Sequence, residues 1–156
     1  MSFSISAFTK AFVLTFFLAF SATTVAMAET KQAVHDRIEN LLGDASTFDQ
    51  IFTHMRKVFA AGNIDDMMEI ADTVEYPLTV NGADGELVIK DRGEFIDQFE
   101  DIFTENVRTA IANQRYENLT VSSDGIMFGN GELWMSAICQ DNACTDQYWA
   151  VTAINR

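Results

Sequence analysis

The chain has 156 residues, 48% of them hydrophobic, a length that predicts one domain and an apolar content too high for wholesale disorder. Ten Lys and Arg residues against 23 Asp and Glu residues give a formal net charge of −13. Because binding to phosphate backbones depends on clustered basic side chains, this balance argues against a nucleic-acid-binding protein and against a polybasic membrane-surface binder.

Residues 1–28 have the pattern of a secretory signal peptide. Lys10 supplies a positive charge, residues 11–20 (AFVLTFFLAF) form an apolar h-region, and residues 26–28 (AMA) form a small-x-small cleavage motif. The alternative is an uncleaved membrane anchor, but hydroxyl side chains after Phe20 dilute the apolar run. We expect cleavage after residue 28, export to the periplasm or the extracellular space, and no stable membrane span afterwards. The remaining chain, 29–156, keeps 9 basic and 23 acidic residues, so its net charge is −14.

The first part of this single mature domain is predicted to be helical. Residues 30–42 carry apolar side chains at helical spacing, and Gly43 can end that helix. A second helix is expected to begin after Ser46 or Thr47 and to end at the Gly62-Asn63 pair. Its continuous apolar stripe consists of Phe48, Ile51, Phe52, Met55, Val58 and Phe59. A short third helix is expected to follow.

The hydrophobic period then changes to that of strands. Residues 76–80 and 86–90 predict a hairpin, in which Pro77 indicates the beginning of a strand or an edge strand. Residues 93–103 predict one amphipathic helix, and Thr104 can cap a helical continuation. The last third predicts antiparallel strands near residues 119–121, 126–128, 132–139 and 145–154.

Cys139 and Cys144 are the only cysteines, and four turn-forming residues separate them. After export we expect them to form a disulfide at the neck of a hairpin, because a redox pair is usually C-x-x-C and a zinc site needs further ligands. That pairing predicts a register with Met135 opposite Tyr148. It also places Trp134 opposite Trp149, and such a tryptophan pair would line a ligand pocket, form a dimer interface or belong to the core.

The titratable residues form no recognisable catalytic or metal-binding motif. His35 and His54 are the only histidines, and their spacing matches no zinc motif. His54 lies beside the stripe of the second helix, where a general base could sit at the mouth of a pocket, although a lone histidine on a helix flank is more often a surface residue. The acidic residues gather on helix faces and turns without calcium-loop spacing. We therefore predict no metal, no cofactor and no catalytic residue.

The order of predicted elements is helix, helix, short helix, hairpin, helix and long antiparallel strands. This order, with the runs Tyr76-Pro77, 126–134 and 153–155, resembles an exported bacterial branch of the nuclear-transport-factor-2-like superfamily, which includes polyketide-cyclase-like and ketosteroid-isomerase-like proteins. The resemblance implies an α+β fold in which N-terminal helices pack on a curled antiparallel sheet that forms a cone with a pocket. The superfamily contains both enzymes and binding modules, so the resemblance alone does not define an activity.

We therefore expect an exported, non-catalytic protein that uses its cone pocket or sheet face to bind a small apolar ligand or a protein partner. The net charge favours a basic partner. The alternatives are an isomerase, cyclase or hydrolase with an acid or histidine base in the pocket, and a structural homodimer with a vestigial pocket. The expected pocket or interface residues are Phe52, His54, Met55, Phe59, Tyr76, Trp134, Tyr148 and Trp149.

Overall fold

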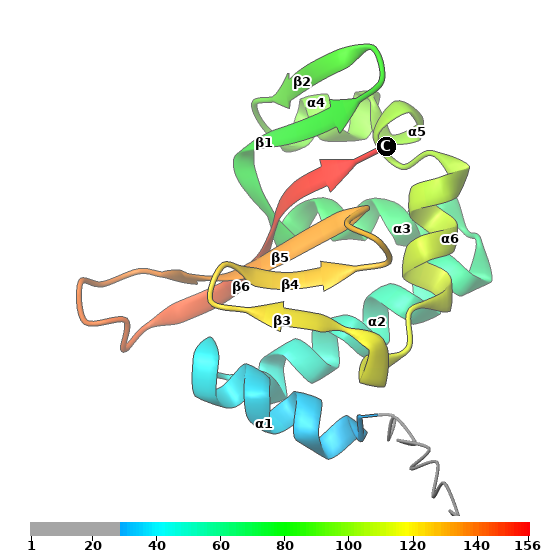
Figure 1. Ribbon diagram of the computed structural model, residues 1–156. Helices are drawn as coiled ribbons and strands as arrows, with labels where there is room; N and C mark the ends of the chain where they lie inside the picture. The colour runs from blue at the N-terminus through cyan, green and yellow to red at the C-terminus, as the bar shows by residue number, and fades with distance from the viewer. Residues whose placement is uncertain (1–28) are drawn as a thin grey trace, which may run out of the picture.

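The computed structural model describes residues 29–156, and the predicted signal peptide, residues 1–28, lies outside the described residues. The described chain is an α+β fold in which helices pack against one face of a six-stranded sheet (Figure 1), which confirms the predicted fold class. Within this part of the chain, no helix has the length and apolar character needed to cross a membrane.

Three helices come first: α1 (Lys31–Leu41), α2 (Ala45–Ala61) and α3 (Ile64–Met68). Helix α2 begins earlier than predicted, because the side chain of Asp44 accepts the N–H of Thr47 at 3.2 Å and so caps the helix one position ahead of Ala45. Its end is where the sequence placed it, since Gly62 adopts the left-handed conformation (φ 71°) that terminates helices.

The 3-10 helix η1 (Glu69–Thr73) leads into the hairpin of β1 (Val74–Gly82) and β2 (Gly85–Ile89). The prediction of an edge position for Pro77 is wrong, because β1 lies between β2 and β6 in the sheet. Pro77, which follows a cis peptide bond, is accommodated because the pairing of β1 with β6 is interrupted between Val74 and Thr79. A proline has no N–H to contribute to a ladder, and here none is required.

The helix predicted over residues 93–103 is instead two short pieces, α4 (Arg92–Asp97) and α5 (Phe99–Ile102), followed by α6 (Glu105–Asn113). The chain leaves helical geometry at Gln98. The three phenylalanines on either side, Phe95, Phe99 and Phe103, form one cluster with ring centroids 4.9 to 6.0 Å apart. Aromatic packing, rather than helical continuity, therefore determines this segment.

After η2 (Tyr116–Asn118) come β3 (Thr120–Ser122), β4 (Gly125–Phe128), β5 (Leu133–Cys139) and β6 (Gln147–Asn155). The strand order is β2-β1-β6-β5-β4-β3, with β2 and β3 at the open edges. Neighbouring strands are antiparallel except β1 and β6, which run parallel, so the sheet is mixed rather than purely antiparallel. The parallel pair brings the early hairpin beside the last strand of the chain.

Candidate functional site

The apolar stripe of α2 is buried against the inner face of the sheet. Phe52 is 5% exposed and Met55 is fully buried. The ring of Phe52 lies 5.1 Å from that of Tyr116 and 5.7 Å from that of Phe128, and Phe59 packs on Phe103 at 5.1 Å. Three of the predicted pocket residues, Phe52, Met55 and Phe59, therefore belong to a packed aromatic core.

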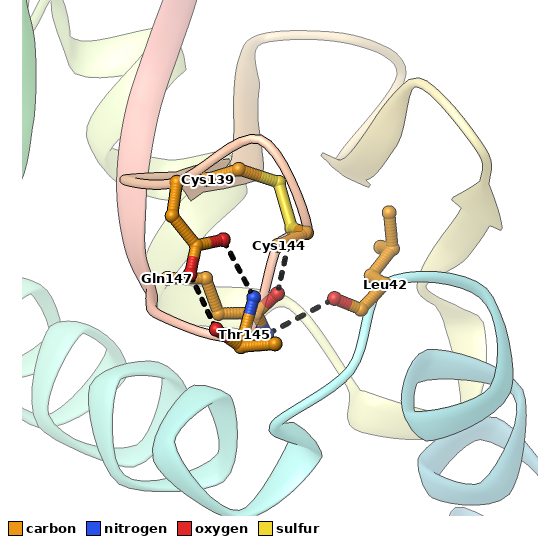
Figure 2. Close-up of a disulfide and its surroundings, with 6 residues drawn as sticks. Leu42, Cys139, Cys144, Thr145 and Gln147 are labelled. Carbon is orange, nitrogen blue, oxygen red and sulfur yellow. Dashed lines mark hydrogen bonds between the residues drawn. A yellow bond between two sulfur atoms is a disulfide. The ribbon is translucent and has the colours of Figure 1, made fainter.

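The predicted disulfide is present, with the Cα atoms of Cys139 and Cys144 4.8 Å apart (Figure 2). The register predicted from it is wrong, because Cys139 pairs in the ladder with Gln147 rather than with Cys144. Cys144 has a left-handed backbone (φ 52°) and lies in the loop that precedes β6. The disulfide thus closes the loop between β5 and β6, and the pairing of β6 with β5 begins at Gln147, three residues after Cys144.

The tryptophan pair predicted from that register is consequently absent. Trp149 lies opposite Ala137, is 4% exposed, and donates its indole N–H to the carbonyl of Asp44 at 3.1 Å. Trp134 lies opposite Ala153, beyond a register shift that separates it from the fully buried Met135. Because successive side chains of a strand point to opposite faces, Trp134 is on the outer face and Trp149 is on the core face.

The tip of the β5–β6 hairpin is tied down by side chains as well as by the disulfide. The carboxylate of Asp141 accepts the N–H of Thr145 at 2.8 Å and also its hydroxyl, and these bonds hold the pKa of Asp141 below its usual range. The side chain of Gln147 donates to the carbonyl of Leu42 at 3.1 Å, which joins the hairpin to the α1–α2 turn (Figure 2). The tip is therefore a braced structural feature.

The outer face of the sheet carries one row of side chains across all six strands. The row follows directly opposed residues: Val88, Thr79, Ala153, Trp134, Met127 and Thr120. No member of this row is charged, and Val88 is 42% exposed. In Figure 1, α2 and α3 lie behind the sheet, so this uncharged row faces away from both helices.

The other predicted site residues are engaged with neighbours at the surface. Tyr148, which is 38% exposed, donates its hydroxyl to Glu75, and this bond raises its pKa. Tyr76 donates to the carbonyl of Ala71 at 3.1 Å, and burial raises its pKa to about 12. His54 is half exposed, with its Nε2 3.8 Å from the carboxylate of Glu69. The structure does not bring these residues together into one site.

A partly buried polar cluster that sequence reasoning missed joins α1, α2 and η2. The Nδ1 atom of His35 lies 3.2 Å from Oδ2 of Asp49. The other carboxylate oxygen of Asp49 and the hydroxyl of Tyr116 are buried and have no hydrogen-bond partner among the described residues. Burial first, and then the neighbouring Asp49, raise the pKa of Tyr116, so its phenol stays protonated. No sequence motif marks these three residues.

The second feature that sequence reasoning missed is a polar hollow of about 460 Å³ between α6, the segment that follows it, and the β4–β5 turn. Asn106, Thr109 and Asn113 face it from α6 at helical spacing. Its remaining lining is Ala110, Gln114, Arg115, Asn118, Gly129, Asn130 and Glu132. Four of the nine asparagines in the chain line the hollow. A search for periodic apolar residues does not detect such a group of polar side chains.

Within residues 29–156, no three His, Cys, Asp or Glu side chains are grouped closely enough to hold a metal ion. No family model, curated protein or solved structure matches the chain. Three surfaces of the described residues are candidates for binding: the uncharged row on the outer face of the sheet, the polar hollow beside α6, and a second hollow of about 450 Å³ on α2 that Asp49 and His54 line.

Proposed function

We propose that this chain is an exported, non-catalytic binding protein that works as a homodimer joined through the outer face of its sheet. The observation that carries the proposal is the uncharged row from Val88 to Thr120, which crosses all six strands on the side away from α2 and α3. Trp134 and Met127 lie side by side at its centre. Large apolar side chains in the middle of such a row are typical of protein interfaces, and the nearest charge on β2 is that of Glu86, two residues before Val88 on the same face.

The uncharged row makes a second copy of the chain compatible with this face despite the acidic net charge. With a net charge of −14 over residues 29–156, two copies repel one another over most of their surfaces. The uncharged row allows close approach without burying like charges. Charges farther away are screened, because the Debye length at physiological salt is about 8 Å.

The size of the face also suits a dimer. Six strands about 4.8 Å apart make a sheet about 24 Å wide. The two longest strands at its centre, β5 and β6, have 7 and 9 residues. At about 3.4 Å per residue, the face therefore has an area of about 600 Å² before side-chain relief is counted. That value approaches the roughly 800 Å² per partner that standard protein interfaces bury.

Two further observations support the other parts of the proposal. The apolar leader pattern together with the closed Cys139–Cys144 disulfide supports export, because disulfides persist in oxidising compartments. The half-exposed position of His54 supports a non-catalytic role. The element order from α1 to β6 supports membership of the nuclear-transport-factor-2-like superfamily as part of the same proposal.

Sedimentation of the mature chain, residues 29–156, tests the dimer. We expect the wild type to sediment as a dimer and Val88→Asp and Trp134→Asp to sediment as folded monomers, because each buries a charge in the interface. Truncating an interface hot spot typically costs 2 kcal/mol or more, so we expect dissociation constants at least about 30-fold higher. Added salt should strengthen the wild-type dimer by screening the like charges of the two copies.

Leu41→Asp is the matched control, because Leu41 is 51% exposed on α1 and does not belong to the outer-face row. It should leave the dimer unchanged, and far-ultraviolet circular dichroism should show that every variant is folded. A wild type that stays monomeric at high concentration overturns the proposal and leaves a basic protein as the electrostatically favoured partner. Equal weakening of the dimer by Leu41→Asp and Val88→Asp would also contradict it.

A further inference from the structure

We infer that the polar hollow beside α6 binds a neutral, hydroxyl-rich small molecule of about the size of a disaccharide. Residues of α6 and of the β4–β5 turn line the hollow, and Figure 1 shows these two segments beside one another. The inference goes beyond the proposed dimer and does not depend on it, because the outer-face row contributes no residue to the lining.

Side chains from outside the β4–β5 turn hold one wall of the hollow in place. The N–H of Gly129 donates to the side-chain carbonyl of Gln114 at 2.7 Å. The side chain of Glu132 accepts the N–H of Asn130, and the side chain of Asn155 donates to the carbonyl of Gly131. This turn is thus ordered before any ligand arrives, which reduces the entropy lost on binding.

Gly129 and Ala110 lie close together in the lining of the hollow. Gly129 has a left-handed backbone (φ 62°), and a Cβ atom placed there would meet the carboxylate of Glu132 and come within 3.0 Å of Cβ of Ala110. Ala110 and Gly129 are the two lining residues without a polar side-chain atom. A ligand would therefore meet hydrogen-bonding side chains from the other eight lining residues.

The rim offers hydrogen-bonding groups that the protein itself leaves unused. Across residues 29–156, no hydrogen bond engages the side chains of Asn106, Thr109, Asn113, Asn118 or Asn130, all of which line the hollow. Each carboxamide provides two N–H donors and an acceptor oxygen. A sugar hydroxyl both donates and accepts, so neighbouring carboxamides can pair with it in either direction.

Charge and size narrow the ligand class. The lining contains one cationic side chain, Arg115, and one anionic side chain, Glu132, so it favours neither an anion nor a cation. The volume of about 460 Å³ falls within the usual range for small-molecule sites. It would hold about fifteen waters at roughly 30 Å³ each, which is comparable to a disaccharide.

Nuclear magnetic resonance titration of the mature protein tests the inference. The probes are cellobiose, maltose, sucrose and trehalose, with trialanine as a peptide of similar size. We expect at least one disaccharide to shift the side-chain NH₂ resonances of Asn106 and Asn113 in a saturable way. Asn113→Ala should weaken that binding about fivefold through the loss of one hydrogen bond, whereas the exposed loop variant Asn142→Ala should not.

Ala110→Leu provides a variant that fills the hollow without removing a hydrogen-bonding group. It should abolish the shifts, whereas Ala60→Leu, an equivalent change at an exposed position of α2, should leave them intact. Shifts with no disaccharide, shifts that persist in Ala110→Leu, or binding of trialanine alone would each overturn the inference. The same titration on the Val88→Asp variant shows whether disaccharide binding persists when the proposed dimer is disrupted.

Discussion

Substituting Gln114 tests how the wall of the hollow is held in place. Among the described residues, Gln114 is the buried polar residue, with an exposed fraction of 6%. Its carbonyl oxygen accepts the N–H of Gly129 at 2.7 Å, and its NH₂ group donates to the carbonyl of Arg115 at 2.8 Å. Gln114→Ala removes both hydrogen bonds and one methylene. At about 1 kcal/mol for each bond and about 0.8 kcal/mol for the methylene, the free energy of unfolding should fall by about 3 kcal/mol.

Urea unfolding of the mature chain measures this loss. The midpoint should fall while the m-value stays unchanged, since the same surface is exposed on unfolding. A domain of this size typically has 5 to 15 kcal/mol of stability, so the variant should remain folded in buffer. Gln50→Ala is the matched control, because Gln50 is exposed on α2 and donates only to the carbonyl of Ser46 at 3.4 Å. It should change stability by less than about 0.5 kcal/mol.

The conservative variant Gln114→Glu separates the two hydrogen bonds. A carboxylate can still accept the Gly129 N–H but cannot donate to the carbonyl of Arg115, so it should be less stable than the wild type at neutral pH. Because the anion is disfavoured in the folded state, the pKa of the introduced carboxyl is raised above the ordinary glutamate value near 4.3. Protonation restores a donor, so the difference should shrink as the pH falls through that raised pKa and be smallest below about 4.3. If Gln114→Ala unfolds at the wild-type midpoint, Gln114 does not brace the turn and the reasoning is wrong.

Three other predictions concern stability. Replacing Cys139 and Cys144 together by serine should lower the free energy of unfolding by about 2 kcal/mol, because the closed loop is short; urea midpoints equal to the wild type would contradict this. Phe52→Ala should cost about 3 to 5 kcal/mol in thermal or urea unfolding, since its ring fills the aromatic core, whereas the exposed Thr53→Ala should cost almost nothing. Burial raises the pKa of Tyr76 from 10.0 to about 12. The protonated phenol therefore contributes fully to the free energy of unfolding below pH 10, and this contribution is lost as the pH rises to 12. Absorbance of the Tyr76 tyrosinate that appears near pH 10 in folded protein would refute this.

Local sequence patterns predicted the secondary-structure elements that bury one continuous apolar face. The apolar stripe of α2 and the Gly62-Asn63 break gave the second helix almost to its bounds, because helical period and a left-handed glycine are both local properties. The same period failed over residues 93–103, where contacts among phenylalanines outweigh helical continuity. Asp44 was missed as the cap of α2 because Ser46 and Thr47 are equally good candidates by residue type.

The register of the terminal hairpin could not be derived from the cysteines. A disulfide constrains two Cα atoms, here 4.8 Å apart, but it does not require both residues to belong to the ladder. The left-handed Cys144 and the register shift beside Trp134 together moved Trp134 and Trp149 to opposite faces. A change of one residue in register reverses the face of every following side chain, so small local differences altered the whole candidate site.

The sequence by itself determined the α+β class, the disulfide and the excess of acidic residues, because composition and short-range periodicity carry that information. Only the tertiary structure decided that the aromatic stripe of α2 is packed core, that β1 runs parallel beside β6, and that Gln114 reaches Gly129 across fifteen positions of chain. It also decided that an uncharged row and an asparagine-lined hollow exist at all. These features consist of contacts between segments distant in sequence, and their energies depend on packing that no local pattern encodes.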